Sequence, residues 1–346
     1  MQPETSTILQ LAEALKVTPA YFFGTNSIQL GEINFRKQSR LTAGEIDLIK
    51  EKVKDKVLRY IEAERLLNIS KVFWNPISKK QVKDKERAEE MAEVVRTEWG
   101  LGSKPIPNVI EMLEENGVRV IEIEASDKFD GLSTRIDDGI PVAVVNESFT
   151  IERKRFTTLH ELGHLMMNIK IDDEKERENA CHRFAGAFLF PAAEVRKAFG
   201  ERRSNISMGE LVAIKEEYGI SAQAAMRRAF DLGIIASVTH KNFFMKIAGN
   251  KREEGLGSYK GIEKSYRLLQ MVFRLTSEGV ISIEKASSLA GMHLPEFRAL
   301  YNNVPMEEES FLYNTEGTAF SEAWDKDEPE YSLNDIKTIN PDYAGR

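Results

Sequence analysis

Apolar residues recur at helical spacing along most of the chain. The longest stripe follows Thr42, which forms a capping box with Glu45 and marks the start of a helix. The same spacing predicts helices over residues 42–67, 84–99, 107–116, 151–168, 176–190, 207–218, 262–276 and 282–302, with a further helix beginning after Ser221. Two short helices are predicted within residues 4–24. The pattern therefore indicates a mainly helical protein.

The period of the pattern changes to two just before residue 150. Residues 118–124 alternate apolar and polar side chains, as a half-buried strand does. Two further apolar runs, 132–136 and 140–146, flank Asp137, Asp138 and Gly139, and an Asp-Gly pair between apolar runs is typical of a hairpin. We expect a small, mainly antiparallel sheet here, so the fold class is α+β.

The composition is that of a globular protein in water. Hydrophobic residues make up 42% and charged residues 30% of the 346 residues, and no apolar run is long enough for a transmembrane helix. The first residues lack the basic and apolar segments of a secretory signal. Cys181 is the sole cysteine, which excludes an internal disulfide and suits a reducing compartment. We expect a cytoplasmic protein that makes no contact with a membrane.

Negative charge is concentrated in residues 306–346. This segment holds eleven acidic and three basic side chains, so the formal net charge of −7 leaves the rest of the chain at only +1. A segment with high charge and low apolar content is predicted to be disordered. The near-neutral remainder does not favour a nucleic-acid-binding protein.

Candidate chemistry lies in the predicted helix over 151–168. His160 and His164 are four residues apart, so on a helix both imidazoles lie on one face and can reach one zinc ion. Glu161 lies beside them and can accept a proton from a water activated by the metal. The pattern predicts a zinc-dependent hydrolase, in which Glu161 then passes the proton to the leaving amine.

A catalytic zinc ion needs a third protein ligand, which we expect from the next helix. Glu178 is the preferred candidate, and a glutamate in this role would make the site gluzincin-like. His182 lies four residues further on and is expected beside the ligands or at the substrate. Cys181 is a weaker candidate because a carboxylate better suits a hydrolytic site. The remaining candidates are acidic residues that a solvated helix face would also explain: Asp172, Asp173, Glu174 and Glu176.

The residues around this motif resemble those of the ImmA/IrrE family of zinc metallopeptidases. The resemblance rests on RFTTLHELGHLMMN at 155–168 and ENACHRFAGAFLFP at 178–191, and extends to the hairpin sequence at 130–146. In that family a glutamate opens an E-x-x-A-N-x-F-A pattern, which implies that Glu178 is the third ligand. Cys181 and His182 replace the alanine and the asparagine of the pattern. The resemblance implies a zincin-like fold and cleavage of helix-turn-helix repressors of the XRE type, which releases silenced genes.

Residues 3–24 resemble the closing helices of an XRE-type helix-turn-helix domain. The helix that would enter the major groove has no counterpart in this sequence, so DNA binding through the segment is not expected. We therefore expect four parts: a partial helix-turn-helix with a linker at 1–35, a zinc metallopeptidase domain at 36–200, a helical domain at 201–305 and an acidic tail at 306–346.

Two other functions are compatible with the sequence. The zinc domain could serve as scaffold or sensor of a transcription regulator, with Arg227 and Arg228 contacting phosphates, although a solvated helix face is the preferred explanation of these arginines. The chain could instead be a toxin–antitoxin component that binds its partner through the acidic tail. In the peptidase function, an extended substrate is expected to pair with the strand at 140–145.

Overall fold

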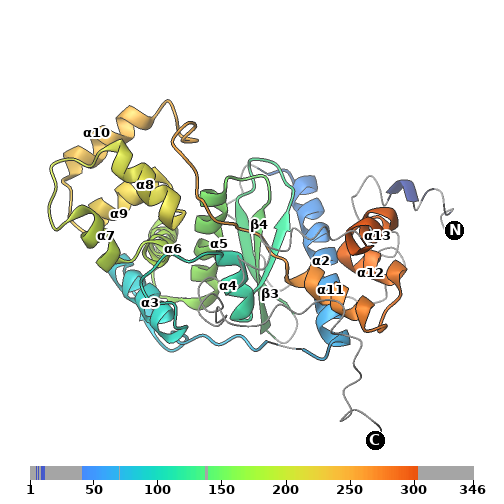
Figure 1. Cartoon of the computed structure of the whole chain (residues 1–346). Coiled ribbons are helices and arrows are strands. Elements are labelled where there is room, and N and C mark those ends of the chain that lie inside the picture. Colours follow the sequence, from blue (N-terminus) through green and yellow to red (C-terminus); the bar gives the residue numbers. More distant parts are fainter. Residues whose placement is uncertain are drawn as a thin grey trace, which may run out of the picture. The chain divides into compact units, whose positions relative to one another are not determined.

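The computed structural model describes residues 5, 7, 9–11, 41–69, 71–136 and 139–302 (Figure 1). The predicted helix-turn-helix remnant, apart from the few residues between 5 and 11, and the acidic tail lie outside the described residues. The chain divides into two compact units, Met1–Leu294 and Pro295–Arg346. Of the second unit, only residues 295–302 of helix α13 (Leu294–Asn302) are described.

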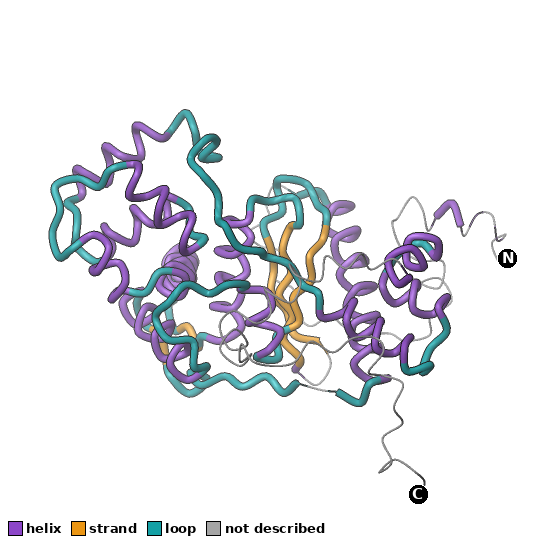
Figure 2. Tube along the Cα trace, in the orientation of Figure 1, coloured by secondary structure: helices purple, strands orange, loops and turns teal. Residues whose placement is uncertain are grey.

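Most of the described residues are helical, as the apolar spacing predicts (Figure 2). Between residues 41 and 294, the described helices are α2 (Ala43–Leu66), α3 (Lys85–Glu98), α4 (Val109–Glu115), α5 (Ile151–Met166), α6 (Glu174–Leu189), α7 (Ala192–Phe199), α8 (Met208–Tyr218), α9 (Ala222–Asp231), α10 (Ser237–Ile247), α11 (Arg267–Ser277) and α12 (Ile283–Ala290). Helices α7 and α10 were not expected from the sequence. A single helix over 282–302 is wrong, because Gly291 takes a left-handed conformation and ends α12.

The capping boxes expected at two helix starts are confirmed. Thr42 accepts a hydrogen bond from the backbone N–H of Glu45, and the Glu45 carboxylate accepts one from the N–H of Thr42. Ser207 and Glu210 exchange the same pair of hydrogen bonds at the start of α8. Each pair satisfies two backbone donors that the helix itself leaves without partners.

The sheet before α5 is mixed rather than mainly antiparallel. Its strands are β2 (Arg119–Ile123), β3 (Gly131–Ile136) and β4 (Ile140–Asn146), in the order β2-β4-β3. The expected hairpin is present, because β3 and β4 are antiparallel. However, β2 pairs with β4 in parallel. The cause is the apolar run in β4, which is buried along nearly its whole length and therefore takes the central position between two neighbours. A second small sheet pairs β1 (Gln81–Val82) with β5 (Asn168–Ile169), also in parallel.

Helix α5 lies between this sheet and α6. It contacts β3 and β4 on one side and α6 on the other, while α2 lies on the opposite side of the sheet, where it contacts β2 (Figure 1). One hydrophobic core joins α3, α4, α5 and α6 to α8, α9 and α10. The predicted domain boundaries stay predictions, but this core contains residues from both sides of position 200.

Buried ion pairs tie α3 to α6 and α9. The Glu89 carboxylate on α3 accepts hydrogen bonds from both terminal nitrogens of Arg228, at 2.7 and 2.9 Å, and another from Arg183. The Arg228 side chain is only 2% exposed, so the expectation that it faces phosphates or solvent is wrong. Its neighbour Arg227 is exposed and pairs with Asp231 at 2.9 Å.

The segment 248–266, called the linker below, returns from α10 to the first half of the chain. Its Glu263 carboxylate accepts hydrogen bonds from the N–H groups of Val109 and Ile110 at the start of α4. The same carboxylate pairs with Arg155 of α5 at 2.6 Å, and both side chains are fully buried. The linker is therefore attached to α5, the helix that carries the predicted metal ligands. Among the described residues, no helix is long and apolar enough to cross a membrane.

Candidate metal centre

Two helices supply the predicted metal ligands. His160 and His164 lie on successive turns of α5, on the same face of the helix, and Glu178 lies near the start of α6. Their ligand atoms form a cluster in which each lies within 4.8 Å of the others. The nearest approaches are 3.1 Å between the two Nε2 atoms, 3.3 Å from His160 Nε2 to Glu178 Oε2, and 3.5 Å from His164 Nε2 to Glu178 Oε1. The structure thus brings together the three residues that the sequence nominated.

The size of this triangle fits a tetrahedral metal ion. With metal–ligand bonds of about 2.0–2.1 Å, two ligand atoms of a tetrahedral zinc site are about 3.3 Å apart. The three observed separations scatter around that value. Two imidazoles and one carboxylate are also the donor set that leaves a fourth position for a water or a substrate. This fit rests on the chemistry and spacing of the donors.

Close packing of α5 on α6 makes the triangle possible. Gly163 lies between the two histidine turns, where a Cβ atom would be 3.3 Å from a ring carbon of Phe184 and 3.6 Å from Cα of Cys181. Because glycine has no Cβ, α6 can approach α5 closely enough for Glu178 to reach both imidazoles. Leu159 and Leu162 are fully buried on the other sides of α5 and hold the helix in the core.

Glu161 lies on α5 directly after His160 and is only 8% exposed. The sheet approaches it closely: a Cβ on Gly131, the first residue of β3, would lie 3.5 Å from Cγ of Glu161 and 2.7 Å from Cγ2 of Thr157. The start of β3 therefore forms one wall beside this carboxylate. A carboxylate in that place can take a proton from a nucleophile at the open position and return it to a leaving group.

Two neighbours of the cluster are the residues that depart from the family pattern. The Cys181 sulfur lies 3.4 Å from Nδ1 of His164, on the far side of the ring from the cluster. Cys181 is buried and lies outside the cluster of three, where it contacts one of the predicted ligands. The ring of His182 lies 4.5 Å from that of His160 and stacks on Phe156 at 5.9 Å. His182 is exposed.

The other acidic candidates do not reach the cluster. Asp173 caps α6 by accepting a hydrogen bond from the N–H of Glu176. Glu174 and Glu176 are exposed in the first turn of the same helix, and Asp172 precedes it, also exposed. These residues have the roles of a helix cap and a solvated surface, which the sequence left open as alternatives.

The strand predicted to receive an extended substrate is not available for that role. Strand β4 pairs with β2 along one edge and with β3 along the other, so substrate pairing at 140–145 is wrong. The sequence could not reveal this, because the order of strands depends on a pairing between residues more than twenty positions apart. The strand that lies at the end of the sheet order next to α5 is β3.

Comparison with known protein families agrees with this geometry. Residues 113–230 match the family model Peptidase_M78, described as the IrrE N-terminal-like domain. The match runs from the end of α4 to α9 and contains the whole cluster. Over these residues the chain is similar to the ImmA/IrrE family, and the expected α+β, mainly helical fold is confirmed.

The similarity to a metallopeptidase family implies a metal cofactor, and His160, His164 and Glu178 form a cluster that could hold one. The match does not reach residues 3–24, so the helix-turn-helix remnant stays a prediction. The comparison with curated proteins gave no match.

Proposed function

We propose that this protein is a zinc-dependent endopeptidase. His160, His164 and Glu178 hold the ion, and Glu161 is the general base and acid. The observation that carries the proposal is the triangle of ligand atoms with sides of 3.1, 3.3 and 3.5 Å, with a buried carboxylate beside it. The family match from α4 to α9 supports the peptidase class independently.

The chemistry divides between the ion and the chain. A bound zinc ion supplies Lewis acidity toward a carbonyl oxygen and makes a water more acidic. Glu161 accepts the proton at its carboxylate and donates it to the amine of the departing peptide. The start of β3 and the packed face of α6 limit access of bulk water on two sides, which keeps these charge interactions strong.

The substrate we propose is a transcriptional repressor of the XRE helix-turn-helix type, whose cleavage would release the genes it silences. This part rests on the resemblance to the ImmA/IrrE family. The rival function as a DNA-contacting regulator loses one of its supports, because Arg228 is buried against Glu89 and has no access to phosphates.

The decisive experiment substitutes Glu161→Gln. The purified, zinc-supplemented variant should retain one zinc ion per chain by elemental analysis and lose cleavage of an XRE-type repressor from the same source. Glu176→Gln is the matched control, because Glu176 is an exposed carboxylate near the start of α6. That variant should keep both zinc and activity. Undiminished cleavage by the Glu161→Gln variant would refute the proposed mechanism.

A further inference from the structure

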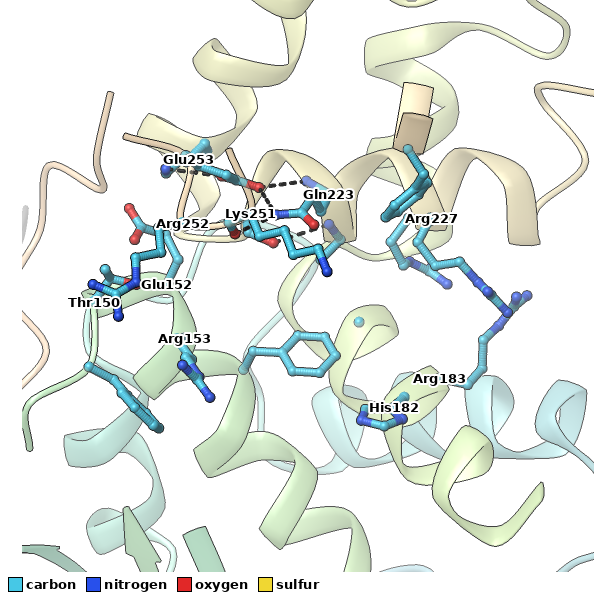
Figure 3. A pocket seen from close by; sticks show the side chains of 18 of the residues that line it. Thr150, Glu152, Arg153, His182, Arg183, Gln223, Arg227, Lys251, Arg252 and Glu253 are labelled. Carbon is cyan, nitrogen blue, oxygen red and sulfur yellow. Dashed lines mark hydrogen bonds and ion pairs between the residues drawn. The ribbon is translucent and has the colours of Figure 1, made fainter. Parts of the chain in front are cut away.

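A large pocket opens next to the metal centre, on the side of α5 and α6 that faces α9. Its volume is about 690 Å³, which is within the usual range for ligand sites. Figure 3 shows Glu253, Lys251 and Gln223 in the upper wall and Arg153, His182 and Arg183 in the lower wall. We call this the basic pocket. None of the three proposed metal ligands lines it, so it is a separate feature of the surface.

The basic pocket has an excess of positive charge. Eight basic and four acidic side chains line it. The most buried of the basic groups are already neutralised, since Lys215 pairs with Glu253 at 3.0 Å and Arg228 pairs with Glu89. Of the exposed ones, Arg153, Arg227 and Arg252 pair with Asp130, Asp231 and Asp127 at the surface. Within the described part of the chain, neither Lys85 nor Lys251 has an ion pair. An anion that enters the pocket therefore meets charge that the protein has not compensated.

The remaining side chains that line the pocket favour binding of a carboxylate at the end of a short aliphatic chain. Arg153 is half exposed and lies over the ring of Phe149, with its guanidinium carbon 3.6 Å from the ring centre. Phe156 and Phe244 add apolar surface. Thr150, at the start of α5, lines the same wall and makes no side-chain capping hydrogen bond, so the positive end of that helix dipole faces the pocket without a cap. Apolar walls with a few cationic groups suit the side chain of glutamate or aspartate.

The pocket and the metal centre share a wall. His182, Phe156 and Asn179 line the pocket, while the ring of His182 contacts that of His160 and Asn179 follows Glu178. An extended polypeptide advances about 3.3 Å per residue. A chain that places one peptide group at the metal centre can therefore place a side chain a few residues away in the pocket.

From these contacts we propose that the basic pocket binds an acidic side chain of the polypeptide that reaches the metal centre, with Lys251 and Arg153 pairing with its carboxylate. The inference deepens the proposed peptidase function, because it names acidic residues near the cleaved bond as a feature of the substrate. A nucleic acid is a poorer occupant, since the chain outside 306–346 carries almost no net positive charge.

The test measures binding without cleavage, on the full-length, zinc-supplemented Glu161→Gln variant. The probes are two fluorescein-labelled octapeptides that differ only in two central glutamates or two central glutamines. Fluorescence anisotropy should give a Kd about tenfold lower for the glutamate peptide at low salt. Adding Lys251→Ala together with Arg153→Ala should abolish that preference. Lys241→Ala, an exposed lysine of α10 outside the pocket, is the control and should leave the preference intact.

Three outcomes would overturn the inference: equal binding of the two peptides, a preference that survives removal of Lys251 and Arg153, or loss of the preference in the Lys241→Ala control. A peptide held through its carboxylates by the metal alone would give the second outcome. Inorganic phosphate is tested as a competitor; if it binds while the glutamates add nothing, the pocket takes free anions instead of a polypeptide. Absence of cleavage by the unsubstituted protein would count against the peptidase function. The binding measurements would still test whether the pocket prefers acidic side chains.

Discussion

Side chains that are missing matter as much at the metal centre as those that are present. Gly163 and Gly131 stand at the two places where α5 meets its neighbours, α6 and β3. A methyl group at either position would push a packed neighbour away from His160, Glu161 and His164. The positions of the proposed ligands therefore depend on two glycines, which have no reactive side chain.

Removing the third ligand should weaken metal binding strongly. Glu178→Ala leaves two imidazoles on α5, and we expect zinc affinity to fall by about a hundredfold or more, because the loss of an outer-sphere partner alone costs 10–100-fold. Titration with a competing zinc chelator measures this. Glu174→Ala, on an exposed residue of the same helix, should leave zinc affinity unchanged. Equal affinity for zinc in both variants would exclude Glu178 as a ligand.

A methyl group at the start of β3 should destabilise the protein. In Gly131→Ala the new carbon would lie 2.7 Å from Cγ2 of Thr157 and 2.7 Å from the carbonyl oxygen of Val144. Relief of such contacts requires backbone movement and costs about 1–3 kcal/mol. Urea denaturation measures the free energy of unfolding. Gly209→Ala is the control, since nothing lies within 4 Å of its added methyl group and alanine favours the helix.

At the scale of the elements, buried ion pairs connect α3 with α6 and α9. Glu89 of α3 lies between Arg183 of α6 and Arg228 of α9, and all three side chains are at most 10% exposed. Burial alone would raise the pKa of Glu89, but hydrogen bonds and charges from Arg228 and Arg183 hold the pKa of this carboxyl below its ordinary value. The group is therefore ionised at neutral pH, and its stabilising effect is lost as the pH falls below about 4.5.

Neutralising this carboxylate should be far more damaging than its position on a charged helix suggests. Glu89→Gln keeps the shape but removes the carboxylate partner of buried Arg228 and leaves buried Arg183 paired with Asp231 alone, so we expect a loss of about 3–5 kcal/mol in the free energy of unfolding. The neighbouring Glu90→Gln removes an exposed pair with Arg87 and should change it by less than about 0.5 kcal/mol. Thermal and urea denaturation of both variants decide the matter; similar values for the two would contradict the role of Glu89.

What the sequence predicted at this scale was local. Capping boxes, the hairpin and the spacing of His160 and His164 all involve residues a few positions apart, and the structure has them as expected. Glu178 is the preferred candidate on the next helix, and the family pattern implies the same residue. The parallel pairing of β2 with β4, the burial of Arg228 and the walls of the basic pocket depend on contacts between distant segments. The sequence does not show whether a charged side chain is buried, because burial depends on a counter-ion from a distant segment.

On the scale of the first unit, the linker joins regions that the sequence treats as separate. Near its end, the Ser265 hydroxyl donates to the Glu114 carboxylate of α4 at 2.8 Å, and the Tyr60 hydroxyl of α2 donates to the same group at 3.1 Å. Burial raises the pKa of Glu114 to about 7, despite these hydrogen bonds. One carboxyl group thus connects α2, α4 and the linker.

The raised pKa of Glu114 should make the protein less stable as the pH rises toward 7. Between about pH 4.5 and 7, Glu114 is protonated in the folded protein and ionised in the unfolded chain, so the folded state binds more protons and the free energy of unfolding falls as the pH rises. The full effect is up to about 3 kcal/mol above pH 7. Glu114→Gln should flatten this dependence, measured as Tm from pH 4 to 8. Glu115→Gln, on an exposed neighbour, should retain it; an unchanged slope in the first variant would disprove the assignment.

The buried pair of Arg155 and Glu263 sets a lower limit on how far the protein can be trimmed. A polypeptide ending at residue 230, where the family match ends, would keep Arg155 on α5 but lack Glu263. The Glu263 carboxylate is both the counter-ion of Arg155 and the acceptor of the N–H groups at the start of α4. Such a fragment would hold the Arg155 guanidinium in its core without this counter-ion and should be prone to unfolding, aggregation and proteolysis. Expression of an isolated catalytic module should therefore include the chain through residue 266, well past the end of the recognisable family sequence.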